Sequence, residues 1–254
     1  MSGTDRRCEA AQLPGPAALI GCAGWAIPKE ASARFPAEGS HLQRYAARFN
    51  AVEINSSFYR PHRPATYARW AGSVPPAFRF AVKLPRSISH QQRLAGAGAL
   101  LRQFAGEVGE LGGKLGCVLV QLPPSLQFGP AIAADFFAAL NDNFSCMLAC
   151  EARHPSWFGA EAGELLRKNS ISRVIADPPA GQPGPHVPTA AAVYLRLHGA
   201  PKVYYSSYNK EYILELAQKL AETREAGHAA WCIFDNTAAG HAIPNALSLM
   251  TADA

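Results

Sequence analysis

Residues 51–55 read Ala-Val-Glu-Ile-Asn, a short apolar run that ends in a polar residue. Side chains alternate between the two faces of a strand, so Glu53 and Asn55 share one face while Val52 and Ile54 share the other. If the second face packs on helices, Glu53 and Asn55 point into the interior. The stretch therefore predicts a strand that carries polar side chains inward at its end.

Seven further runs have the same form, and helix-length stretches separate nearly every pair. The eight runs are residues 19–22, 51–55, 78–84, 115–122, 147–153, 173–177, 193–198 and 231–236. This is the layout of a (β/α)8 barrel, and 254 residues is a typical length for one. We predict an α/β fold with a single TIM-type barrel domain over residues 17–254, preceded by a frayed or disordered tail over residues 1–16.

The segment between the sixth and seventh predicted strands is rich in proline and glycine. Pro178 to Pro188 falls where the sixth helix should be, and its prolines forbid a regular helix over much of that span. We expect an irregular loop that replaces or shortens the sixth helix, on the face where the strands end.

Charge and cysteine usage limit the functional classes. A formal net charge of +5 falls well short of the dense basic stripe of a dedicated nucleic-acid binder, but it permits an anionic partner. None of the six cysteines forms a CxxC pair, which is typical of a reduced, cytoplasmic compartment. No window approaches the ~20 apolar residues of a membrane span, so we expect no membrane partner. The sequence leaves the oligomeric state open.

The strand ends define the candidate site, because chemistry in such barrels gathers where the strands end. Inward carboxylates are costly to dehydrate and normally have a partner or a function, so we assign Glu53 and Glu151 as general acid or base, with His198 orienting the substrate or transferring a proton. Candidate substrate-binding residues are Trp25, Asn55, Tyr59, Lys83, Gln121, Arg153, Asp177, Arg196 and Asn236.

The basic members of this set indicate an anion. The planar guanidinium of Arg153 or Arg196 binds phosphate or carboxylate through two hydrogen bonds, and Lys83 adds a point charge. The aromatic residues Trp25 and Tyr59 follow strand ends and could stack on a sugar or base.

A structural interpretation competes with the functional one. Lys83, Arg153 and Arg196 could merely balance Glu53, Glu151 and two aspartates, Asp177 and Asp235, in a closed ion-pair network. An open site should leave donors around Arg196 unpaired, whereas a structural network should close each charge on another.

Three other chemistries receive less support from the sequence. No HxH, HExxH or paired-cysteine spacing indicates a metal, so we expect no cofactor and assign no metal ligand, although a divalent metal is not forbidden. Barrel glycosidases take their carboxylates from strands four and seven, which here end in Gln121 and in Arg196 and His198. A buried Lys83 could form a Schiff base if its pKa were lowered.

Six strand-end strings together resemble one family. They are Val52-Glu-Ile-Asn-Ser-Ser-Phe-Tyr59, Phe78-Arg-Phe-Ala-Val-Lys83, Gln121-Leu-Pro-Pro-Ser125, Arg153-His-Pro-Ser-Trp-Phe158, Tyr194-Leu-Arg-Leu-His-Gly199 and Phe234-Asp-Asn236. The set resembles domain-of-unknown-function family 72 (DUF72), also called YecE-like, over about residues 19–250. The resemblance implies a TIM-type barrel in a bacterial, cytoplasmic protein and brings no activity with it.

We therefore expect a YecE-like barrel that acts as an enzyme on a phosphate- or carboxylate-bearing substrate at the barrel mouth, with hydrolase-type chemistry on a phosphate ester as the first hypothesis. The alternative is a non-catalytic barrel that binds a ligand or a nucleic acid and whose inward charges form a structural network. The strand-end residues are the same in both hypotheses.

Overall fold

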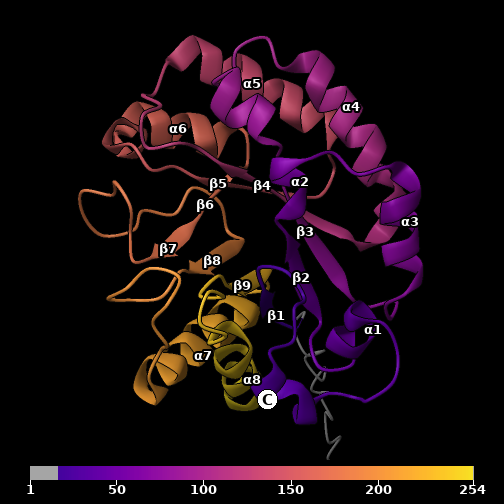
Figure 1. The fold of residues 1–254 in the computed structure, drawn as a ribbon. Helices are drawn as coiled ribbons and strands as arrows, with labels where there is room; N and C mark the ends of the chain where they lie inside the picture. Colours follow the sequence, from indigo (N-terminus) through magenta and orange to yellow (C-terminus); the bar gives the residue numbers. More distant parts are fainter. Residues whose placement is uncertain (1–16, 254) are drawn as a thin grey trace, which may run out of the picture.

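The computed structural model describes residues 17–253, so the tail predicted over residues 1–16 lies outside the described residues. Strands and helices alternate along the chain, and helices surround the strands (Figure 1). The strands are β1 (Leu19–Cys22), β2 (Ala51–Ile54), β3 (Arg79–Lys83), β4 (Leu115–Gln121), β5 (Met147–Glu151), β6 (Ser172–Arg173), β7 (Ile175–Asp177), β8 (Val193–Leu197) and β9 (Ala230–Phe234).

The α-helices lie in the stretches between the predicted strands and after the last of them. They are α1 (His41–Ala46), α2 (Ser56–Tyr59), α3 (Pro64–Gly72), α4 (Gly98–Val108), α5 (Pro130–Asn143), α6 (Ala160–Lys168), α7 (Lys210–Glu225) and α8 (Ala242–Ala252). Short helical turns are η1 (Lys29–Arg34), η2 (Ser87–Gln91), η3 (Gly109–Lys114) and η4 (Pro155–Phe158). The first helix begins with a capping box, in which Ser40 and Gln43 bond each other's backbone N–H groups.

All strand pairs are parallel, which confirms the predicted α/β class. Their hydrogen bonds define a four-stranded sheet in the order β1-β9-β8-β7 and a five-stranded sheet in the order β2-β3-β4-β5-β6. The strands of the predicted barrel are thus divided between two hydrogen-bonded sheets. The sixth predicted strand is split at Val174, so that β6 pairs with β5 while β7 pairs with β8. An isolated bridge from Ala23 to Glu53 connects the ends of β1 and β2.

No helix follows β7. Residues 178–192 form turns and irregular backbone, as the prolines predict. None of the helices between residues 17 and 253 is both long enough and apolar enough to cross a membrane.

Two apolar clusters hold the fold together. The larger lies between strands and helices and includes Val52, Ile54 and Leu101. The smaller lies on the inward face of the strands, where Ala51, Ala81, Cys117 and Ala149 of one sheet meet Tyr194, Trp231 and Ile233 of the other. Small side chains on one sheet leave room for the aromatic rings of the other, since protein interiors pack densely.

A charged layer lies directly above this inner cluster. Because same-face residues are two apart, the last inner apolar residue of six strands is followed, two positions further on, by a polar residue on the same face. The pairs are Ala51 and Glu53, Ala81 and Lys83, Leu119 and Gln121, Ala149 and Glu151, Tyr194 and Arg196, and Ile233 and Asp235. The apolar cluster therefore forms the base on which the candidate site rests.

Candidate functional site

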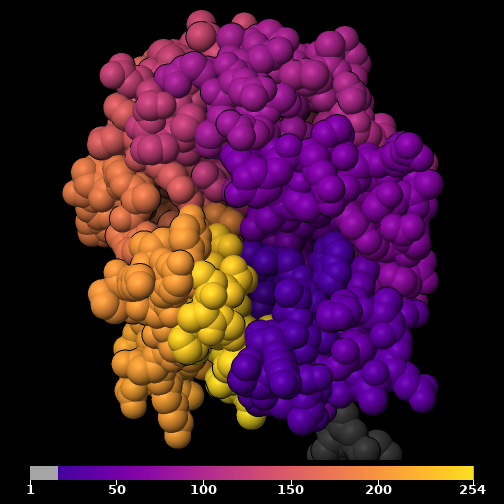
Figure 2. Space-filling view, in the orientation of Figure 1, coloured from indigo at the N-terminus to yellow at the C-terminus, as the bar shows by residue number. Residues whose placement is uncertain are grey.

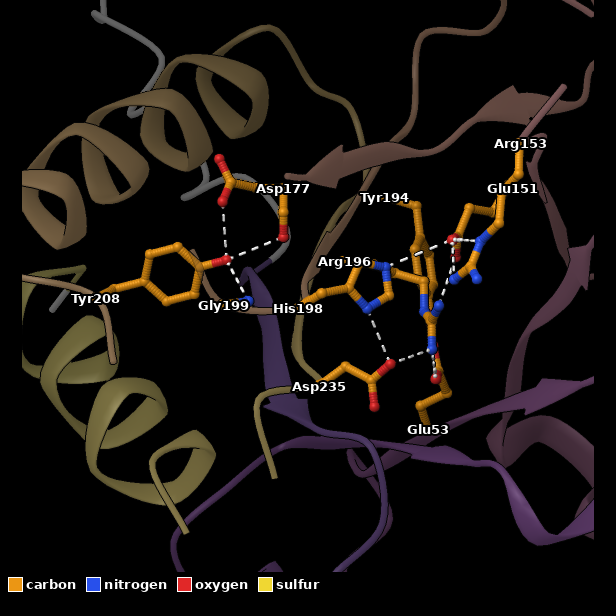
Figure 3. Close-up of polar contacts among 10 residues, drawn as sticks. All are labelled: Glu53, Glu151, Arg153, Asp177, Tyr194, Arg196, His198, Gly199, Tyr208 and Asp235. Carbon is orange, nitrogen blue, oxygen red and sulfur yellow. Dashed lines mark hydrogen bonds and ion pairs between the residues drawn. The ribbon is translucent and has the colours of Figure 1, made fainter. Parts of the chain in front are cut away.

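Arg196 lies at the centre of the charged layer and is fully buried, with 0% of its side chain exposed. Its Nε donates to Glu53 Oε2 at 3.0 Å, and its Nη2 donates to Glu53 Oε1 at 2.7 Å and to Asp235 Oδ2 at 3.0 Å. Its Nη1 donates to Glu151 Oε2. Figure 3 shows this guanidinium between the three carboxylates. Arg196 is therefore committed to protein carboxylates rather than turned toward a ligand.

Glu53 is equally enclosed. Its side chain is 0% exposed, both oxygens accept from Arg196, and Oε2 also accepts from the Tyr194 hydroxyl at 2.9 Å. A carboxylate with both oxygens engaged and no access to solvent has no free lone pair facing a substrate. Glu53 therefore lies enclosed below the site, whereas the sequence predicts a catalytic role for it.

Glu151 links Arg196 to the rim of the layer. Arg153 donates to Glu151 Oε1 from Nε at 2.8 Å and from Nη2 at 2.7 Å, and His198 Nε2 lies 3.4 Å from the same oxygen. On the other side of the imidazole, His198 Nδ1 lies 3.0 Å from Asp235 Oδ2. The three acids Glu53, Glu151 and Asp235 therefore face three basic groups.

The pKa values of these groups follow from their partners. Burial would raise the pKa of Glu151, but Arg196 and His198 outweigh it and hold that pKa well below its usual range. Asp235 behaves in the same way, again through Arg196 and His198. Burial would lower the pKa of His198, yet its hydrogen bond to Asp235 and the nearby carboxylate of Glu151 raise it. The network is thus most stable with Glu151 and Asp235 ionised and His198 protonated.

Lys83 differs from the other basic groups of the layer. Its side chain is buried, with 8% of the residue exposed, and among residues 17–253 no carboxylate lies within ion-pair distance of Nζ. The Nζ atom instead lies 4.3 Å from the centre of the Phe58 ring. Burial and the charge of Arg196 lower the pKa of Lys83 to about 8, although nearby acids act the other way.

Lys83 ends β3 and Arg153 follows β5, and β4 alone lies between these two strands in the five-stranded sheet. Burial lowers the pKa of His90, and so do the charges of Lys83, Arg86 and Arg153. Arg153 remains 20% exposed and Asp235 13% exposed. These partly open edges are where a ligand could reach the layer.

Asp177 lies apart from the charged layer, as Figure 3 shows. Its Oδ1 is 2.9 Å from the Tyr208 hydroxyl and its Oδ2 is 2.8 Å from the Tyr212 hydroxyl. The Tyr208 hydroxyl also accepts from the backbone N–H of Gly199 at 2.8 Å. The predicted binding residue Asp177 therefore anchors the segment after β8, because it pairs in register with Leu197 of the outer face, whereas Ala176 pairs with the inward Arg196.

The two aromatic candidates are also separate from the charges. Trp25 packs edge-on against Trp70, with 5.1 Å between the ring centres, and lines a cavity of about 380 Å³ together with Asn55 and Ser56. Tyr59 is 71% exposed and lines a different cavity beside Arg86. Figure 2 shows the face of the molecule in the orientation of Figure 1, with a recess where the indigo, purple and yellow segments meet.

The remaining predicted residues are buried amides. Gln121 lies at the end of β4 in the charged layer. Asn236 donates from Nδ2 to Asn245 Oδ1 at 2.9 Å and to Ser206 O at 2.9 Å, so it fastens loops together. Asn55 and Asn236 each keep a buried Oδ1 without a hydrogen-bond partner in the described part of the chain.

Two members of the network, Asp235 and Tyr194, lie outside the set of predicted site residues. Both could have been found from the strand pattern, because Tyr194 shares a face with Arg196 and Asp235 is two residues beyond the inward Ile233.

Across residues 17–253, no three His, Cys, Asp or Glu side chains form a group that could hold a metal ion. The acids of the layer are instead committed to Arg196, Arg153 and His198.

The fold and the site define a class: an α/β protein of parallel strands with a charged layer at their carboxyl ends. Within this class the chain belongs to the family described as protein of unknown function DUF72, whose model matches residues 19–253. The resemblance seen in the strand-end strings is thereby confirmed.

Curated relatives support the same assignment. The chain is 32% identical to the UPF0759 protein YecE of Escherichia coli K12 over 166 residues, covering 62% of this chain and 58% of YecE. The chain thus spans less than two thirds of that relative's length. It is 22% identical to the UPF0759 protein YunF of Bacillus subtilis, across 91% of this chain and 93% of YunF.

Solved structures share the fold. A DUF72 family protein of Thermotoga maritima superposes with a TM-score of 0.78 at 24% identity, covering 93% of this chain and 98% of that one. A sugar phosphate isomerase/epimerase of Parabacteroides distasonis superposes with a TM-score of 0.56 at 12% identity, covering 96% and 95%. The second similarity concerns the fold alone.

Proposed function

We propose that this chain is an enzyme that binds a small anionic molecule at the carboxyl ends of the strands and uses Lys83 to transfer a proton. One observation carries the proposal. Six charges of the layer close on one another, whereas Lys83 has no acidic partner within residues 17–253. A buried cation without a partner is costly, and an anionic ligand would offset that cost.

The rim of the layer supplies further contacts. The exposed edge of Arg153 provides a second cation on the side of Lys83, and Asp235 engages its neighbours only through Oδ2. Its Oδ1 is left to accept a hydrogen bond from a hydroxyl group of the ligand. A molecule with a phosphate or carboxylate and neighbouring hydroxyl groups fits this arrangement.

Lys83 is a better proton-transfer group than the predicted carboxylates. A general acid or base works best when its pKa lies near the operating pH. Glu151 is held ionised by its cationic partners, and Glu53 has both oxygens engaged. Lys83, with a pKa of about 8, meets the requirement. In this proposal Glu53 and Glu151 position Arg196, Arg153 and His198 instead of reacting.

The strands themselves also support a binding site. We propose that the two parallel sheets together form the eight-stranded barrel, with the bridge between Ala23 and Glu53 at one seam and Val174 at the other. In such barrels the strand carboxyl ends bind substrates. Sugar phosphates are the first compounds to test, because they join an anion to hydroxyl groups and because a protein of similar fold is named for them.

The experiment compares thermal stability with ligand present. Glucose 6-phosphate and inorganic phosphate should raise the melting temperature, since a ligand that binds only the folded state stabilises it by mass action. Glucose should have less effect. The shift should be lost in Lys83→Met and kept in Lys219→Met, which removes an exposed lysine on α7. Equal shifts in the two variants would contradict the proposal. Phosphate release from the same esters tests the hydrolase hypothesis.

A second candidate function is non-catalytic ligand binding, and the closed pairing of six charges favours it. In that case ligands would still raise the melting temperature through Lys83, but no sugar phosphate would be isomerised or hydrolysed. Binding to a nucleic acid would instead show a strong dependence of affinity on salt.

A further inference from the structure

Lys83 occupies a position that suits covalent chemistry. Lys83 is the last residue of β3, and its backbone oxygen accepts a hydrogen bond from the Ser57 hydroxyl at 2.7 Å. Its Nζ atom lies over the Phe58 ring. Within residues 17–253 its Nζ makes no hydrogen bond or ion pair, yet it is not among the fully buried atoms that lack a partner. The Nζ atom therefore keeps some access to solvent beside the Phe58 ring.

The surroundings increase the share of the neutral amine relative to an ordinary lysine. Burial and Arg196 on β8 lower the pKa of Lys83, and Glu53 on β2, Glu151 on β5 and Asp235 after β9 oppose them, for a value of about 8. His90 of η2 also faces this group. At pH 7 about a tenth of the Lys83 side chains are then uncharged, against well under a thousandth for an ordinary lysine. A neutral amine has the lone pair that attacks a carbonyl carbon.

We propose that Lys83 forms a Schiff base with the aldehyde or ketone group of a small anionic substrate. This inference rests on the proposed function and names its substrate as a carbonyl compound. Lys83 first releases one proton from its ammonium group to solvent. The amine nitrogen then bonds to the carbonyl carbon as the C=O π bond breaks, and a proton moves from that nitrogen to the oxygen to give a carbinolamine. Uptake of one proton from solvent by the hydroxyl group expels it as water and leaves a protonated imine, so the positive charge of the original ammonium is restored and no oxidant or reductant is required.

The charged layer would help to bind the substrate beside Lys83, and the imine would then promote proton removal from it. Arg153 and the positive charge retained on the imine nitrogen attract the substrate's anionic group, while Asp235 Oδ1 faces its hydroxyl groups. The imine also withdraws electrons from the adjacent carbon, which promotes proton removal there.

Reductive trapping tests the inference on the full chain. Glyceraldehyde 3-phosphate and glyceraldehyde are each incubated with the protein and sodium borohydride, and peptide mass mapping locates the adduct. We expect one adduct at Lys83 with at least a tenfold preference over the exposed Lys168 and Lys219. Lys83→Arg keeps the charge but should abolish the adduct, whereas Lys219→Met should retain it. Trapping at Lys83 should rise between pH 7 and 9, below the range in which surface lysines respond.

The outcomes separate the two proposals. Adducts spread evenly over the lysines, or an unmodified Lys83, would overturn the Schiff-base inference. If phosphate still stabilised the protein through Lys83 in that case, the anion site would stand alone. Trapping of glyceraldehyde at Lys83 without any advantage for its phosphate would support the Schiff base and refute the anion site.

Discussion

Arg196 illustrates how one residue organises the site. The guanidinium joins carboxylates from β2, from β5 and from the segment after β9, so it connects strands of both sheets. Three buried acids around one cation would repel one another without it. The residue that sequence reasoning assigned to an anionic substrate is therefore the one that holds the protein's own anions together.

Replacement of Arg196 should be costly. Arg196→Met leaves buried carboxylates on Glu53 and Glu151 without their main partner, and we expect a loss of about 3–5 kcal/mol in the free energy of unfolding by urea. Arg167→Met removes the exposed ion pair with Glu164 and should change stability by less than about 1 kcal/mol. Similar small losses in both variants would show that the network contributes little.

The pH dependence of stability should reveal His198. Partners raise its pKa in the folded state, so its stabilising contribution is complete below the ordinary value of 6.5 and is lost as pH rises through the folded-state value. Groups facing His198 are Asp235, Glu151, Arg196 and the Tyr204 ring. The difference in melting temperature between wild type and His198→Gln should be largest near pH 6 and shrink by pH 9. A constant difference would mean that His198 is neutral throughout.

At the scale of elements, the contact between β1 and β2 is unusually close. A Cβ built on Gly21 would lie 2.0 Å from Ala51 O and 2.8 Å from the Tyr45 hydroxyl. That hydroxyl donates to Ala51 O and accepts from the Cys22 N–H, so it replaces ladder bonds between the two strands. Glycine at position 21 is therefore required by packing rather than by backbone angles.

Two glycine substitutions test this contact. Gly21→Ala should lower the free energy of unfolding by about 3 kcal/mol or more, because the added methyl group must displace backbone. Gly106→Ala, inside α4 with nothing within 4 Å, should raise it by about 0.5–1 kcal/mol. Denaturant unfolding of both variants checks the pair, and a stable Gly21→Ala protein would contradict the assigned packing.

Elements also show where prediction from sequence succeeds. The alternation of apolar and polar residues predicts the strands, and the prolines of residues 178–188 predict the loop that the structure shows over residues 178–192, because burial and proline geometry act locally. The break at Val174 could not be predicted. Residues 173–177 read as one strand, and only their pairing partners, β5 on one side and β8 on the other, divide it.

At the scale of the whole molecule, the family model begins at residue 19 and covers the chain to residue 253. We predict that a chain beginning at residue 17 keeps the melting temperature of the full protein within about 2 °C and keeps its response to phosphate. Calorimetry on both chains measures this. A large loss of stability in the shorter chain would show that residues 1–16 belong to the folded unit.

The sequence by itself determined the α/β class, the order of the strands, the family and the residues that gather at the strand ends. Each follows from local periodicity or from strings read along the chain. Only the tertiary structure decided which of these charges close on one another and which stays open. Arg196, Glu53, Glu151 and Asp235 lie far apart in sequence, and pairing among them depends on distances of about 3 Å set by the packing of the two sheets. The same packing separates Asp177 from the layer and leaves Lys83 without an acidic partner in the described chain.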